Sequence, residues 1–105
     1  MSRQASWQDP HVKRFENAVV QISRRFMPEH FDKNERIRLD LRTRAINLFD
    51  SDRPEDDICR EVYGYVDLVT RNVLDETRRQ QLSVVISEEM LSCRKDFKRE
   101  AELAQ

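Results

Sequence analysis

The most constraining feature of the sequence is the stretch from Pro54 to Ala101, which is nearly half of a chain of 105 residues. It contains no proline after Pro54, and its one glycine, Gly64, is the only glycine in the chain. Proline and glycine disfavour helices more than any other residues, and the apolar residues of this stretch recur every three or four positions. The stretch therefore predicts helix, and we expect the preceding residues to fold back on it as shorter helices.

The first of these shorter helices is predicted at residues 10–27. Asp9 followed by Pro10 is typical of a helix N-cap with proline in the first turn, and Pro28 ends the helix because the residue before a proline disfavours helical geometry. Its apolar residues are spaced alternately three and four apart and form one stripe: Val12, Phe15, Val19, Ile22 and Phe26.

A second helix is predicted at residues 33–49, with Asp32 or Asn34 as its N-cap. Its main apolar face consists of Ile37, Leu41, Ala45, Leu48 and Phe49. Leu39 and Ile46 lie to the side of that face, so more than half of the circumference is apolar. A helix of this kind is either central in a bundle or covered by a partner.

The long stretch itself changes phase near Asp75. Continued in steps of three and four, the apolar ladder of its first half falls on polar residues: Glu76, Gln80, Ser83 and Ser87. The apolar residues resume on a different face as Leu82, Val85, Ile86, Met90, Cys93 and Phe97. Thr77 and Gln80 match a capping box, which favours a break into helices at 54–75 and 78–102. One long kinked helix is the alternative.

Together these patterns predict an all-α protein, a four-helix bundle formed by a single domain over residues 9–102. Residues 1–8 are expected to be a flexible arm, and residues 103–105 a frayed tail. The single Gly and three Pro disfavour β-rich and dinucleotide-binding folds, which need glycine in their turns and phosphate loops.

The sequence contains no pattern that favours catalysis. One glycine cannot form a phosphate-binding loop, and His and Cys have no zinc-ligand spacing. Cys59 and Cys93 fall on apolar helix faces, where a thiol stays protonated, whereas His11 and His30 fall on the predicted surface. We therefore expect no enzyme activity, cofactor, metal or small-molecule substrate. No apolar run approaches the roughly 20 residues that span a bilayer, and no signal peptide is recognisable, so a cytoplasmic protein is expected.

The leading hypothesis is a non-catalytic module that binds other proteins. A bundle this small cannot bury all its apolar residues, so we expect a homodimer that docks on a larger protein as adaptor, chaperone, regulator or inhibitor. Phe31 and Tyr63 are further candidate anchors, and Gly64, on the polar side of its helix, either marks a close approach of another backbone or is simply tolerated. The predicted partner-binding residues are Trp7, Val20, Arg38, Leu39, Arg42, Ile46, Val84 and Leu91.

The alternative hypothesis is a nucleic-acid-binding regulator. Arginines gather at the end of the first predicted helix and on the second, where they could contact phosphates: Arg24, Arg25, Arg36, Arg38 and Arg42. They do not form one continuous stripe on a helical wheel, and the formal net charge of the chain is -1. Ion pairs with neighbouring acidic residues are therefore the favoured interpretation.

Overall fold

The computed structural model describes residues 5–104 and contains four helices. They are α1 (Pro10–Phe26), α2 (Phe31–Leu48), α3 (Glu55–Thr70) and α4 (Glu76–Leu103). The predicted all-α four-helix bundle is confirmed. Residues 1–4 of the expected arm and residue 105 of the expected tail lie outside the described residues.

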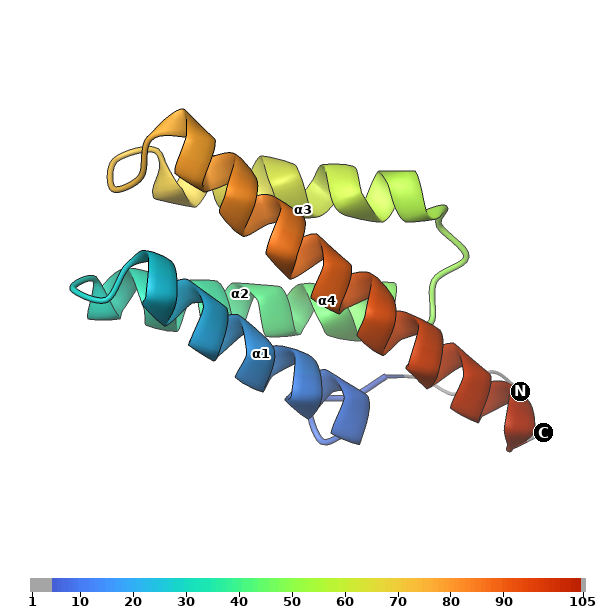
Figure 1. Cartoon of the computed structure of the whole chain (residues 1–105). Helices are drawn as coiled ribbons and strands as arrows, with labels where there is room; N and C mark the ends of the chain where they lie inside the picture. The colour runs from blue at the N-terminus through green and yellow to red at the C-terminus, as the bar shows by residue number, and fades with distance from the viewer. Residues whose placement is uncertain (1–4, 105) are drawn as a thin grey trace.

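The longest helix, α4, lies against two neighbours in turn. Figure 1 shows it running in front of the bundle from the end of α3 to the start of α1. It packs mainly on α3 and α1, and α1 also packs on α2, whereas the contact between α2 and α3 is looser. Residues on the flanks of α1 therefore lie beside α2 or α4, and those on the flanks of α3 lie mainly beside α4.

The core contains the apolar stripes that the sequence predicts. Val12, Phe15 and Val19 of α1 are fully buried, and most of the predicted stripe residues of the other helices are buried as well. Val85, predicted on the apolar face of α4, is instead 37% exposed, and Phe26, at the end of the α1 stripe, is half-buried. Phe49 lies at the centre, with ring centroids 6.2 Å from Phe15 and 5.8 Å from Phe97. These tilted and edge-on ring contacts join the end of α2 to α1 and α4.

The break near Asp75 is confirmed, and the single long helix is excluded. α3 ends at Thr70, five residues earlier than predicted, and α4 begins at Glu76. The predicted cap was wrong, because Thr77 lies inside α4 and the carboxylate of Asp75 accepts the N-terminal hydrogen bond from the Arg78 N–H at 2.8 Å. Capping by an extended residue immediately before the helix is the usual geometry, and Asp75 occupies that position.

The start of α2 also differs from the prediction. The helix begins at Phe31, so Asp32 and Asn34 lie in its first turn and cannot be its N-cap. The N-cap is His30, which makes no side-chain capping bond. Asn34 is instead buried, and its Nδ2 donates to the Met27 carbonyl at 2.8 Å, which satisfies an acceptor at the end of α1.

The connection between α2 and α3 is held by one side chain of α4. Arg94 is only 8% exposed, and its guanidinium donates to the carbonyls of Leu48, Ser51 and Arg53 at 3.0, 2.8 and 2.7 Å. Lys98 also donates to the Ser51 carbonyl. Two cations thus lie at the C-terminal end of α2, where the helix dipole is negative.

Candidate interaction surfaces

A groove of about 350 Å³ lies between α3 and α4, and we call it the Gly64 groove. A Cβ atom built on Gly64 would meet no heavy atom within 4 Å, and no glycine in the described chain has a positive φ. Neither close packing nor backbone geometry within the described chain therefore requires glycine here. The groove is lined by Arg60, Tyr63, Gly64, Asp67, Arg79, Gln80 and Ser83.

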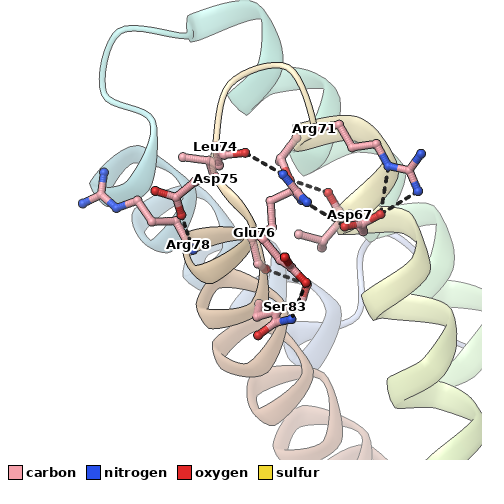
Figure 2. A network of polar contacts seen from close by, with 11 residues as sticks. Asp67, Arg71, Leu74, Asp75, Glu76, Arg78 and Ser83 are labelled. Atoms are coloured by element: carbon pink, nitrogen blue, oxygen red, sulfur yellow. Dashed lines mark hydrogen bonds and ion pairs between the residues drawn. The ribbon is translucent and has the colours of Figure 1, made fainter.

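One end of the Gly64 groove is fixed by ion pairs. Asp67 accepts hydrogen bonds from Nε of Arg71 and Nε of Arg79, each at 2.9 Å. Arg79 also donates to the Leu74 carbonyl at 2.8 Å, which joins α3, the turn and α4. Figure 2 shows Asp67 and Arg71 facing each other beside the α3–α4 turn. These hydrogen bonds hold the pKa of Asp67 below its ordinary value of 3.8.

Apolar side chains are exposed beside this groove. Tyr63, on its α3 wall, is 41% exposed, and Val84, which follows the lining residue Ser83 on α4, is 39% exposed. Of the predicted partner-binding residues, Val84 is thus the one adjacent to the Gly64 groove. Leu91, two helical turns along α4, is half-buried against the core and lines a separate cleft with Glu55.

A second groove, of about 290 Å³, lies between α1 and the start of α2, and we call it the α1–α2 groove. Phe31 stands at its edge and is 74% exposed, more than any other described aromatic side chain. Val20, half-buried on α1, lies beside it. The lining residues are Val20, Arg24, Phe31, Asp32, Asn34, Glu35 and Arg38.

The side chain of Asn34 contains a hydrogen-bond acceptor that is unsatisfied in the α1–α2 groove. The residue is 7% exposed, and the bond from Nδ2 to the Met27 carbonyl fixes the orientation of the amide. Its Oδ1 atom has no hydrogen-bond donor among the described residues. Such a buried acceptor costs about 1–3 kcal/mol, and because the atom is enclosed, a donor from outside reaches it only when the groove wall opens.

Most of the arginines predicted to contact nucleic acid are held in ion pairs. Arg38 bridges Glu16 and Glu35, and Arg42 lies 3.6 Å from the same Glu16 carboxylate. The hydrogen bond from Arg38 also lowers the pKa of Glu35. Arg36 lies 3.7 Å from Asp40, an ion pair on the side of α2 that faces α3, where Asp40 accepts from the Tyr65 hydroxyl at 2.6 Å.

Within residues 5–104, Arg24 and Arg25 form no ion pair. Arg24 lines the α1–α2 groove, whereas Arg25 does not. The five arginines therefore do not form one phosphate-binding surface, and contact with nucleic acid stays a prediction that nothing in this arrangement favours.

The eight predicted partner-binding residues do not share one surface. Val20 and Arg38 line the α1–α2 groove, and Arg42, Leu39 and Ile46 continue along the same flank of α2 at helical spacing. Ile46 is half-buried against the core, which reduces what it can offer a partner. Val84 and Leu91 lie on α4, and Trp7 is exposed in the segment before α1.

Sequence reasoning missed Asp32 and Asn34 as groove residues, because both were interpreted as caps. For Asn34 a signal existed: it lies three positions before Ile37 and seven before Leu41, so it is a polar residue on the apolar face of α2. Gly64 was recognised as unusual because it is the only glycine of the chain, but the groove around it depends on how α4 crosses α3.

The two cysteines and His11 have partners or apolar surroundings within the described fold. Both thiols are free, and burial raises the pKa of Cys59 and of Cys93, which keeps them protonated at neutral pH. Arg14 Nε donates to Cys93 Sγ at 3.2 Å, and His11 is engaged with Glu100. Among residues 5–104, no three His, Cys, Asp or Glu side chains are grouped as a metal site requires.

Comparison with known proteins adds no assignment. No family model, curated protein or solved structure matches the chain. Over the part of the chain that the structure describes, no helix is long and apolar enough to cross a membrane.

Proposed function

We propose that this protein is a non-catalytic interaction module that docks on a larger protein as an adaptor, chaperone, regulator or inhibitor. The observation that carries the proposal is Gly64. A glycine inside a helix costs roughly 0.5–1 kcal/mol relative to alanine. No neighbouring atom and no special backbone geometry in the described chain accounts for that cost. Close approach of another chain is a physical reason for glycine at an exposed helix position.

The walls of the Gly64 groove support this proposal. Tyr63 offers an aromatic face with a hydroxyl at its end, a combination that is enriched where proteins contact each other. The opposite wall is held by Arg79 between Asp67 and the Leu74 carbonyl, so little ordering is left to occur on binding. The groove therefore fits a partner segment that inserts one apolar side chain over Gly64.

The test is photocrosslinking from the groove wall. Tyr63 is replaced by p-benzoylphenylalanine, and the protein is irradiated in cells that contain its natural partners. We expect an adduct heavier than two copies of the 12.6 kDa chain, which a dimer alone cannot explain. The adduct should weaken with Gly64→Ala, because the added methyl group occupies the space of close approach, and disappear with Gly64→Leu, which fills the groove.

The control carries the photoreactive residue at Glu88, which is exposed on α4 and does not line the groove. An adduct formed equally from Glu88, or one that survives Gly64→Leu, would contradict docking in this groove. The lack of any adduct heavier than a dimer would overturn the proposed function. Circular dichroism of both Gly64 variants establishes that each retains its helices.

A further inference from the structure

We propose that the α1–α2 groove is the contact between two copies of this chain, related by a two-fold axis. The first reason is its shape. Phe31 projects from the start of α2, 74% exposed, and the recess beside it contains the half-buried Val20. A projection and a recess on one surface complement each other when the surface meets its own copy, since each Phe31 enters the recess of the other chain.

The second reason is charge. Arg24 and Asp32 line the same groove, both are exposed, and neither forms an ion pair within the described residues. They come from different helices and carry opposite charges. In a two-fold contact Arg24 of each copy meets Asp32 of the other, so two ion pairs form at once and no charge is left over. Such reciprocal pairs set the register and partner choice of an interface.

The third reason is the unsatisfied acceptor. Asn34 Oδ1 is buried in the wall of the groove without a donor. The first turn of α2 has unpaired donors instead, because the N–H groups of Phe31, Asp32 and Lys33 have no intrahelical acceptor and His30 adds no side-chain cap. When Phe31 of one copy enters the recess, the first-turn N–H groups of that copy come near the wall that encloses Asn34 of the other. Because Oδ1 is enclosed in the single chain, its pairing with one of these donors requires the wall to open locally.

This contact is separate from the Gly64 groove, which is formed by α3 and α4. The dimer therefore leaves that groove open in both copies. It does not depend on the proposed function, and its test uses the purified protein alone.

The experiment is sedimentation equilibrium of the wild type, of Arg24→Glu and of Asp32→Arg, from micromolar to millimolar concentration. We expect a wild-type dimer. Each single variant places two like-charged pairs in the contact and should weaken the dimer by on the order of tenfold or more. An equimolar mixture of the two variants should dimerise again. In the mixed dimer the two substituted side chains, now a glutamate and an arginine, face each other, and the unchanged Arg24 of one chain meets the unchanged Asp32 of the other.

Recovery in the mixture is specific to a contact between chains, since an effect inside one chain cannot be rescued by mixing. Arg25→Glu is the matched control: it changes the net charge by the same amount, one residue from Arg24 but outside the groove, and should dimerise as the wild type does. The proposal is overturned by a monomeric wild type, by single variants that dimerise like the control, or by a mixture that stays monomeric. Circular dichroism establishes that the variants are folded.

Discussion

Replacement of Arg94 by methionine tests whether a buried cation stabilises this fold or destabilises it. Arg94 is 8% exposed, donates to three carbonyl oxygens and forms no ion pair with a carboxylate in the described chain. Burial of the guanidinium lowers the pKa of Arg94, which is the electrostatic cost of taking the charge out of water. Methionine has a similar length, favours helix and carries no charge, so Arg94→Met removes both the cost and the bonds.

The magnitude follows from what each carbonyl keeps after the replacement. The Leu48 carbonyl still accepts from the Ser51 N–H and hydroxyl, and the Ser51 carbonyl still accepts from Lys98. Arg53 is an exposed residue, so its carbonyl can accept from water. No carbonyl is therefore left buried and unpaired. The loss in free energy of unfolding is for this reason smaller than the sum of three hydrogen-bond energies. We expect a loss of about 1.5–3 kcal/mol, the worth of one hydrogen bond to a charged group.

The assay is urea unfolding followed by circular dichroism, with the free-energy difference taken from the shift in midpoint at constant slope. Arg99→Met is the matched control on the same helix: its contact with Asp96, at 3.7 Å, is exposed, and its loss should cost less than about 0.5 kcal/mol. If Arg94→Met costs no more than the control, or stabilises the protein, the desolvation cost outweighs the three bonds and the reasoning is refuted.

Three further predictions concern other parts of the fold. Gly64→Ala should raise the free energy of unfolding by about 0.5–1 kcal/mol in the same urea assay, since the added methyl meets no atom and the unfolded chain loses freedom; a loss of stability would contradict this. Asp67 is held by two arginines that lower its pKa, so its contribution is complete above pH 3.8, its ordinary pKa, and is lost as the pH falls through its lowered value; Asp67→Asn should flatten that part of a stability-against-pH curve, and an unchanged curve would count against it. With a thiol reagent at neutral pH, Cys59, which is partly exposed, should react before Cys93, which is fully buried, and equal rates would show that the fold opens locally around α4.

Periodicity was sufficient to predict the helices and their break. The apolar faces of α3 and α4 could not belong to one straight helix, because they point in directions that differ by more than the angle one residue turns around the helix axis. The structure separates the two helices at residues 71–75. The cap was harder to predict, because Asp75 and Thr77 both have capping side chains. Only the extended backbone of Asp75 (φ -70°, ψ 170°) decides between them, and no local pattern specifies it.

Arg94 shows a different limit. Its position on α4 lies at the edge of the buried face, where a charged residue is ordinarily expected to turn toward water. The acceptors that keep it buried belong to the α2–α3 connection, more than 40 positions away in the chain. A sequence pattern on one helix contains no information about such acceptors, so this contact could be found only from the packed structure.

The binding residues illustrate the same limit for function. The helical spacing of apolar residues identifies those that lie off the main stripes. What such a residue can contact depends on which helix packs beside its own. Because α1 packs on α2, Val20 lies beside Phe31, and because α4 packs on α3, Val84 lies beside the Gly64 groove. Val20 and Val84 thus belong to two different surfaces, and we expect these surfaces to be inactivated separately. Arg24→Glu should weaken self-association while crosslinking from Tyr63 persists, and Gly64→Leu should remove the crosslinked adduct while self-association persists. If both variants abolished both properties, the two grooves would have to act as one binding surface.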